Sequence, residues 1–555
     1  MSFFKQAGLV FRKYPFFRIA LVLFFIGLSF FMSFFLTRRQ KKVPVIELLD
    51  PASAIPGDII AIYGKNFGRT RGTSGVEISG DKLTSSSYIS WDDDKIRILL
   101  PQNVQDGLVY VETQGGRSEP KIFANKIDIP VQVNTDRQNA RPQIFSVSQT
   151  KILPLETISI TGKNFGISRG DSLVYFSSQI DGKESDSYIT CTDPANDYEF
   201  WGDQEIRVRV PDGASSGRIF IRTDKTESNS YNITVDSESH KSFSDNCIYL
   251  VSLSANITDI VSSGEGNITL RIPKPPLTSF QRSVEVTVSN PEPVIPEYMN
   301  TIVHQFTVKK NPPKKISVSH NMVISVWAVN TAVNPQNIKP LSEKSKSLYG
   351  ACLYQDSLVP AADEKITELA KNICQKETNP YIRAKKIFTY MIENFKVESI
   401  PEESKRKAVD LLSRKKGDSY DFSVIFSALC RASGIPCRNL SGILVDSNRN
   451  TKNHFWNEIY LEKAGWIPVD TALGAGMEYE AFKKQNPDSY YYFGNLDSQH
   501  ILFSRGWNEL KPSQSTSKTV FRPRSYALQS IWEESSPEIQ KYSSFWSDVQ
   551  VLGIY

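Results

Sequence analysis

Three polar residues in the C-terminal half of the chain could form a catalytic unit: Ser419, His454 and Asp470. They stand in the blocks RKKGDSYDFSVIFSALCRASGIPCR, NHFWNEIY and AGWIPVD. A serine hydroxyl attacks a carbonyl only when a base within hydrogen-bond reach removes its proton and an oxyanion hole awaits the tetrahedral intermediate. A histidine held by an aspartate supplies that base in a serine triad. These three residue types therefore allow hydrolysis or acyl transfer on a peptide or amide.

The order of the three blocks resembles the bacterial transglutaminase-like superfamily, a branch of the papain-like thiol fold. In that family the first block begins G-D-C, the second carries H-x-W-x-E and the third ends in an aspartate. The resemblance places the nucleophile on Ser419, the base on His454 and the orienting carboxylate on Asp470. The same motifs imply three residues that support the site: Asp418, Trp456 and Glu458.

This chain departs from the family at its most reactive position, because Ser419 replaces the cysteine. A thiol with a reference pKa of about 8.5 becomes a standing thiolate beside an imidazolium or a helix N-terminus. A serine hydroxyl does not ionise in such surroundings, so it needs a base to remove its proton during attack. Neither Cys430 nor Cys437 takes over the role, because Cys430 lies about 16 Å further along the same predicted helix and Cys437 is interpreted as a packing residue.

Three hypotheses follow for this site. In the first, the transglutaminase-like domain is non-catalytic and binds a protein, peptide or glycan partner. In the second, Ser419, His454 and Asp470 form an active serine triad in an amide hydrolase or acyl transferase. In the third, the natural residue at position 419 is cysteine and the protein is a thiol protease or transamidase.

The elements that must position these residues can be predicted from periodicity. Two amphipathic helices are expected over 362–376 and 379–395, followed by the nucleophile helix from Ser419 to Ala432 with Asp418 as its cap. At the first turn of that helix the dipole favours developing negative charge. The strands NLSGILV, FWNEIYL and GWIPVD then carry His454 and Asp470.

Further towards the N-terminus the chain repeats itself. GKNFG occurs at 64–68 and again at 162–166, and Trp91 has a counterpart in Trp201. The offset grows from 98 to 110 residues, which places an insertion in the second copy around residues 181–197. Short alternating strands bounded by Gly, Pro and Asn are typical of a sandwich, and both copies resemble IPT/TIG immunoglobulin-like domains. Their role is interpreted as a spacer or a ligand-binding module.

A third β-rich segment follows, with the strands NITLRIPKPP, SVEVTVS, IVHQFTV and MVISVWAV. It is similar to the β-domain that precedes the core in bacterial transglutaminase-like proteins. We therefore predict a multidomain protein with one transmembrane helix, two immunoglobulin-like β-sandwiches, a third β-domain and an α+β transglutaminase-like core. The predicted boundaries are a tail over 1–18, a signal-anchor over 19–37, IPT/TIG-like domains over 43–128 and 141–236, the β-domain over 245–345 and the core over 355–555.

The anchor is predicted from an uncharged apolar run, residues 19–37. Its 19 residues match the roughly 20 needed to cross a bilayer and exceed the apolar region of a cleavable signal. Four Lys and Arg residues flank each side, so the positive-inside rule does not decide the orientation. By analogy with surface β-modules we expect a single-pass protein with its bulk outside the cytoplasm, in the periplasm or at the cell surface.

Composition narrows the partners further. The net charge of +5 is small for 555 residues and spread along the chain, so we expect no nucleic-acid partner. The six cysteines contain no C-x-x-C pair and no metal-ligating constellation is evident, so we expect neither a metal nor a cofactor. The expected partners are the membrane, through residues 19–37, and a protein, peptide or glycan outside the cytoplasm.

Overall fold

The computed structural model of the chain divides into two compact units, Met1–Val133 and Asn134–Tyr555. The residues that it describes are 42–101, 104, 107–125, 141–180, 183–192, 196–223, 226–236, 240–401, 404–483, 486–514 and 516–555, with Phe16, Leu23, Phe24 and Gly27. Within these stretches no helix has the length and apolar character that a membrane span requires. The predicted tail and signal-anchor, residues 1–37, lie outside the described residues except for those four positions.

The first unit is a two-sheet sandwich around one apolar core. One sheet has the strand order β1-β3-β7-β6, and the other runs β2-β10-β8-β4-β5 with β9 beside β8. Their bounds are β1 Val45–Asp50, β2 Ser53–Ala54, β3 Ile59–Lys65, β4 Gly75–Ile78, β5 Asp81–Lys82, β6 Tyr88–Trp91, β7 Lys95–Leu99, β8 Gly107–Thr113, β9 Gly116–Arg117 and β10 Lys121–Asn125.

The second unit begins with a sandwich of the same design. Its first sheet, β11-β13-β17-β16, repeats the order of the first sheet in unit one. The bounds are β11 Gln143–Val147, β12 Lys151–Ile152, β13 Thr157–Lys163, β14 Leu173–Ile180, β15 Lys183–Thr190, β16 Tyr198–Trp201, β17 Glu205–Arg209, β18 Gly217–Arg222 and β19 Tyr231–Val235. The predicted repeat is therefore confirmed at the level of strand order.

The glycine and the tryptophan that recur in both copies are required by the backbone of the turn after β3 and β13. A Cβ on Gly162 would lie 2.0 Å from the carbonyl oxygen of Gln143, so only glycine fits there, and Gly64 meets the same obstacle in the first copy. The indole of Trp201 donates to the carbonyl of Phe165 at 3.2 Å, which closes the turn after β13. The predicted insertion corresponds to the β14–β15 hairpin, which is longer than the β4–β5 hairpin of the first sandwich.

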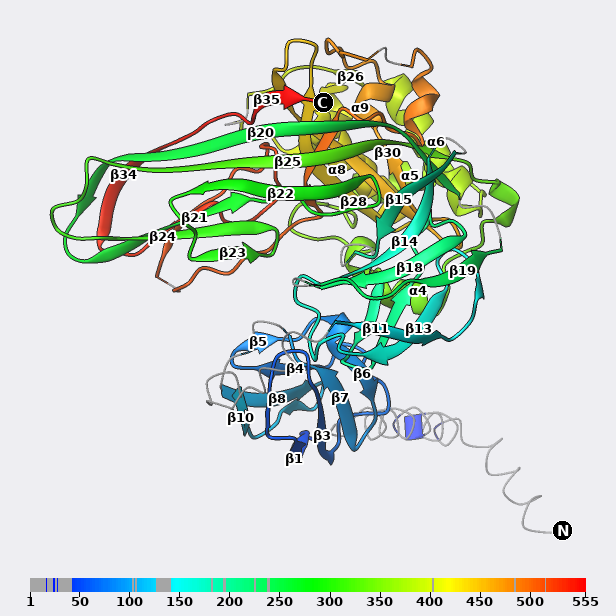
Figure 1. The fold of residues 1–555 in the computed structure, drawn as a ribbon, viewed down its shortest axis with the longest axis vertical. Helices are drawn as coiled ribbons and strands as arrows, with labels where there is room; N and C mark the ends of the chain where they lie inside the picture. Colours follow the sequence, from blue (N-terminus) through cyan, green and yellow to red (C-terminus); the bar gives the residue numbers. More distant parts are fainter. Residues whose placement is uncertain are drawn as a thin grey trace. The chain divides into compact units, whose positions relative to one another are not determined.

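A long β-ribbon continues from the second sandwich, as Figure 1 shows. Its strands belong to two sheets. The ten-stranded sheet includes β20 Lys241–Ser262, β22 Gln281–Asn290 and β25 Lys315–Thr331, whereas β21 Gly266–Pro273, β23 Ile295–Tyr298 and β24 Thr301–Val308 form a five-stranded sheet with two strands from the C-terminal part of the chain. All four strands predicted in this segment are present, as β21, β22, β24 and β25. One ten-stranded sheet joins ribbon and sandwich, because β14 pairs with β20 in parallel at Ile180 and Phe243.

The core follows with helices, a four-stranded sheet in the order β30-β29-β28-β31, and a C-terminal tail of strands. The bounds are α4 Glu343–Leu348, α5 Glu364–Cys374, α6 Pro380–Asn394, β26 Lys396–Val397, α7 Leu411–Arg414, β27 Lys416–Gly417, α8 Ser419–Ala432, β28 Cys437–Val445, β29 Thr451–Leu461, β30 Gly465–Val469, α9 Thr471–Gly474, β31 His500–Arg505, β32 Lys518–Val520, β33 Glu533–Ser535, β34 Ile539–Trp546 and β35 Gln550–Ile554. The three predicted helices are confirmed as α5, α6 and α8.

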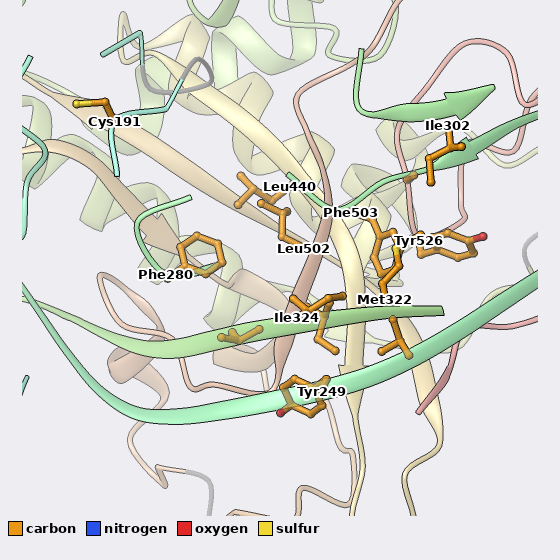
Figure 2. Packing of buried hydrophobic residues seen from close by; sticks show 14 of the residues in the cluster. Cys191, Tyr249, Phe280, Ile302, Met322, Ile324, Leu440, Leu502, Phe503 and Tyr526 are labelled. Carbon is orange, nitrogen blue, oxygen red and sulfur yellow. The ribbon is translucent and has the colours of Figure 1, made fainter. Parts of the chain in front are cut away.

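The core sheet lies between the helices and the ribbon. Ile459 and Leu461 of β29 pack with α5, α6 and α8, whereas Trp456 packs on the side of the ribbon. Figure 2 shows the ribbon side, where Leu440 and Leu502 belong to the same cluster as Ile324. The C-terminal strands β34 and β35 pair with β20 of the ribbon instead of with the core sheet. The core and the ribbon are thus held together through both packing and backbone pairing.

Candidate active site

Ser419 occupies the first turn of α8, the helix that the sequence predicts to carry the nucleophile. Asp418 caps this helix, because its side chain accepts a hydrogen bond from the backbone N–H of Asp421 at 3.0 Å. The side chains of Phe422 and Phe426, on the same helix, are fully buried in the core. The position therefore has the favourable dipole of a helix N-terminus and a rigid support.

The hydroxyl of Ser419 is bonded to the backbone of the neighbouring strand. Its Oγ accepts a hydrogen bond from the N–H of Phe455 at 3.3 Å. Among the residues that the structure describes, no hydrogen bond joins this oxygen to the ring of His454. Ser419 is 6% exposed and His454 is fully buried, so the site is almost closed to solvent. As it stands, the arrangement does not prime the hydroxyl for attack.

The structure brings His454 and Asp470 together. Their Nε2 and Oδ2 atoms lie 2.5 Å apart, and both side chains are fully buried. The other oxygen of Asp470 accepts from the backbone N–H groups of Ala472 and Leu473 at the start of α9, which fixes the carboxylate. Burial lowers the pKa of His454, and the nearby Asp470 only partly offsets this. The imidazole is therefore neutral at pH 7, as a general base must be.

The remaining ring nitrogen of His454 differs from the one that Asp470 engages. Nδ1 is buried and has no hydrogen-bond partner among the described residues. A buried polar atom without a partner is costly, and such atoms call for an explanation. Nδ1 is the atom with which His454 could accept a proton, because Nε2 is engaged by Asp470.

A second histidine, missed by the sequence reasoning, completes the buried cluster. His500 lies at the start of β31 with Nε2 3.2 Å from Asp470 Oδ2 and Nδ1 2.8 Å from Asp497 Oδ1. Burial alone would lower the pKa of His500, but the two carboxylates outweigh it and raise that pKa to about 9. The available signal was a lone histidine at the head of the apolar strand HILF in the segment SQHILFSRG.

Trp456 packs against both imidazoles. Its ring lies 5.8 Å from the ring of His454 at an interplanar angle of 16°, and 5.2 Å from the ring of His500 at 74°. The indole is fully buried. Trp456 thus restricts the orientation of both rings.

An arginine from the C-terminal tail ties down the start of α8. Arg524 donates to both carboxylate oxygens of Asp418, at 2.7 and 2.6 Å, and to Asp421 at 2.7 Å. Its guanidinium also lies over the ring of Tyr420, 4.4 Å from the centroid. Arg524 lies 105 positions from Ser419 in the sequence, and nothing in the local pattern marks its role.

Glu458, which the sequence motifs predicted to support the site, lies in a separate cluster with two arginines. Its carboxylate accepts from Arg438 at 2.9 Å and from Arg505 at 2.8 Å, and no contact with Ser419 or His454 occurs in the described part of the chain. Burial alone would raise the pKa of Glu458, but the two guanidinium groups outweigh it and lower that pKa to about 2. Glu458 therefore supports the sheet through an ion cluster and does not touch the triad positions.

His454, Asp470 and His500 offer ligand atoms within 4.8 Å of one another, a spacing that a metal ion could bridge. Two ligands of one tetrahedral zinc, each about 2.0–2.1 Å from the ion, would lie roughly 3.3 Å apart. The 2.5 Å separation of His454 Nε2 and Asp470 Oδ2 is too short for that and fits a shared proton. We interpret the cluster as an imidazole–carboxylate–imidazole hydrogen-bond chain.

Comparison with known proteins agrees with this architecture. Residues 367–471 match the model of the transglutaminase-like superfamily, and residues 44–135 match that of the IPT/TIG domain. The chain therefore contains a transglutaminase-like core and an IPT/TIG domain, as the sequence motifs predicted. An uncharacterized protein of Haemophilus influenzae is 28% identical over 172 residues. That match covers 26% of this chain and 46% of the relative, so the chain spans under half of the relative's length.

Two solved structures are also similar. A candidate cysteine protease from Cytophaga hutchinsonii shares 15% identity, with 57% of this chain and 91% of that chain covered and a TM-score of 0.34. The periplasmic domain of TgpA from Pseudomonas aeruginosa shares 12% identity, with 41% of this chain and 86% of that chain covered and a TM-score of 0.24. At these TM-scores neither structure bears on what this chain does.

Proposed function

We propose that this chain is a membrane-anchored, extracytoplasmic protein whose transglutaminase-like core is non-catalytic and binds a protein, peptide or glycan partner. The observation that carries the proposal is the bonding of Ser419, whose Oγ accepts from the N–H of Phe455 and forms no hydrogen bond with His454 among the described residues. Without a base at its proton, a serine hydroxyl is a weak nucleophile. The anchor rests on the apolar run at residues 19–37.

A second candidate is a serine-dependent amide hydrolase or acyl transferase. It is favoured by the retained pair of His454 and Asp470 at 2.5 Å, together with the buried Nδ1 of His454, which lacks a partner among the described residues. A triad would require the Ser419 hydroxyl to come within hydrogen-bond reach of that nitrogen. Catalytic hydrogen bonds are often long in the absence of substrate, so the two candidates need a chemical test.

The test compares Ser419→Cys with the wild-type protein. The non-catalytic proposal predicts no labelling of wild-type Ser419 by a fluorophosphonate probe. In Ser419→Cys, alkylation by iodoacetamide should show a pKa well below the ordinary thiol value of about 8.5, because the helix N-terminus stabilises the thiolate. Ser413→Cys, at an exposed position on α7, is the matched control and should titrate normally.

Two outcomes separate the candidates. Labelling of wild-type Ser419 by the probe, abolished in His454→Ala, would establish the serine triad and reject the non-catalytic core. A normal thiol pKa in Ser419→Cys would show that the retained residues no longer form a thiol-activating site at all. Mass spectrometry of the peptide that contains residue 419 reads both results.

A further inference from the structure

Two buried imidazoles compete for one carboxylate oxygen in the candidate active site. Oδ1 of Asp470 already accepts the N–H groups of Ala472 and Leu473, at 3.0 and 2.9 Å. Oδ2 therefore receives both rings, with Nε2 of His454 at 2.5 Å and Nε2 of His500 at 3.2 Å. The two ring centroids lie 5.6 Å apart. At that separation the charge of one ring acts directly on the protonation of the other.

The hydrogen-bond partners of His500 require a proton on each of its two nitrogens. Nδ1 lies 2.8 Å from Oδ1 of Asp497, and Nε2 faces Asp470. An ionised carboxylate only accepts hydrogen bonds, so both nitrogens must donate, and an imidazole that donates twice is a cation. Asp497 is fixed as an acceptor, because it also receives the N–H of Gln499 at 2.9 Å and the hydroxyl of Tyr479 at 3.3 Å. His500 is therefore the imidazolium of the cluster.

His454, in contrast, needs only one proton. Its Nε2 donates to Asp470, whereas Nδ1 is buried and has no hydrogen-bond partner within the described part of the chain. A second proton, on Nδ1, would leave a buried and charged N–H group without an acceptor, which is costly. His454 is therefore the neutral ring, with its lone pair on Nδ1.

The charge on His500 weakens His454 as a base. A cation beside Asp470 neutralises part of the carboxylate charge that would otherwise favour a second proton on His454. Burial is the largest cause that lowers the pKa of His454, and His500 lowers it further against the opposing effect of Asp470. The other titratable groups near the cluster are an exposed lysine and two tyrosines whose pKa values are raised by burial: Lys452, Tyr479 and Tyr492. None of these three supplies a negative charge at pH 7.

We propose that His500 is a positioning residue that restrains the base of this site, because it is the imidazolium that shares Oδ2 of Asp470 with a neutral His454. Trp456 packs against both rings and holds them in this arrangement. The inference rests on the non-catalytic core proposed above and adds a second cause for it. The first cause is the hydroxyl at position 419, and the second is a base whose counter-charge is already taken.

Nitrogen NMR of the full chain with isotope-labelled histidines tests this assignment, because protonated and unprotonated ring nitrogens resonate at different frequencies. The chain has five histidines, and the variants His500→Gln and His454→Ala identify the two rings. At pH 7 we expect protons on both nitrogens of His500 and on Nε2 alone of His454. In His500→Gln the titration midpoint of His454 should move to higher pH, because the competing cation is gone. A role of His500 in packing alone would not move that midpoint.

Asp497→Asn gives a second comparison if His500→Gln does not fold. It keeps the shape of the side chain but removes one of the two anions that hold His500, so the titration midpoint of His500 should move to lower pH. Asp356→Asn is the matched control. It removes a carboxylate that bonds Arg431 at 2.6 Å in the same core, and it should leave the midpoints of both rings in place.

Three results would overturn the proposal. They are an unprotonated ring nitrogen on His500 at pH 7 in the wild type, a midpoint of His454 that stays or falls in His500→Gln, and an unchanged midpoint of His500 in Asp497→Asn. All three report ring protonation and not the reactivity of Ser419. Labelling of Ser419 by the fluorophosphonate probe would instead reject the non-catalytic core and leave the charge assignment of the two rings standing, so the two proposals fail separately.

Discussion

The Oγ of Ser419 lies 3.3 Å from the backbone nitrogen of Phe455 and accepts its hydrogen bond. Because side chains alternate along a strand, the residue before Phe455, His454, directs its ring to the opposite face of β29 from Phe455. The serine oxygen is therefore engaged by the strand backbone instead of by the imidazole. This contact occupies one acceptor position of the Ser419 oxygen and leaves its hydroxyl proton without a base among the described hydrogen bonds.

Removing Arg524 should destabilise the core strongly. Arg524→Gln removes the guanidinium that bonds both Asp418 and Asp421 and leaves Asp421 with Arg406 at 3.8 Å, and breaking a buried ion pair in this way costs about 3–5 kcal/mol. Urea unfolding measures the loss. Arg222→Gln is the matched control, since Arg222 is 54% exposed in its pair with Glu227 and should cost less than about 1 kcal/mol.

The loss of unfolding free energy in Arg524→Gln should depend on pH. Burial and the neighbouring Asp418 raise the pKa of Asp421 to about 6, although Arg524 opposes this. Below that pH Asp421 takes up a proton and no longer needs the guanidinium as strongly. The destabilisation by Arg524→Gln should therefore be smaller at pH 5 than at pH 7. An equal loss at both values would contradict the assignment of the effect to a buried charge.

A histidine pair inside the ribbon should make the protein sensitive to acid. His304 and His320 share a contact of 2.9 Å between their Nε2 atoms, and burial lowers both pKa values to about 4. Their stabilising contribution is present above the unfolded pKa of about 6.5 and is lost as the pH falls towards 4. At pH 5 one such histidine costs about 2 kcal/mol.

The double variant His304→Leu/His320→Leu tests this pair. It should flatten the dependence of unfolding free energy on pH between 6.5 and 4 relative to the wild type. Guanidinium titrations at several pH values give the comparison. A slope in the double variant as steep as that of the wild type would assign the acid sensitivity to other groups.

His500 should stabilise the protein at low pH and lose this effect at high pH, the reverse of the His304 and His320 pair. Its pKa is raised to about 9 by Asp497 and Asp470 against the effect of burial, so its contribution is complete below the unfolded pKa of about 6.5 and disappears as pH rises through 9. His500→Gln should therefore lower the unfolding free energy at pH 6 by up to about 3 kcal/mol and have little effect at pH 10. A penalty that does not change with pH would mean that only packing is lost.

Helices, caps and turns of the core could be predicted from the sequence because each depends on residues that are close together in the chain. The cap at Asp418 and the helix from Ser419 to Ala432 follow from a polar residue before an apolar periodic run, and the structure has both. The repeat could be predicted because each GKNFG turn needs glycine at a fixed place. The strands of the ribbon follow from their alternation.

Other features depend on contacts between distant parts of the chain. Arg524 and His500 reach the site from the C-terminal tail and from β31, and no periodicity or motif signals such tertiary partners. Glu458 was expected to support the site, but its two arginine partners draw it into a separate ion cluster. The bonding of the Ser419 hydroxyl to a backbone N–H depends on how α8 meets β29, which only the fold determines.

The most direct test of a non-catalytic core is intact-mass spectrometry of the wild-type protein during reaction with p-nitrophenyl acetate. An active serine would accumulate an acetyl adduct on its oxygen, as acyl-enzymes do. With a non-catalytic core we expect no acetylation of Ser419 and the same background hydrolysis in wild type, Ser419→Ala and His454→Ala. An acetyl group mapped to Ser419 that forms in the wild type but not in His454→Ala would contradict a non-catalytic core.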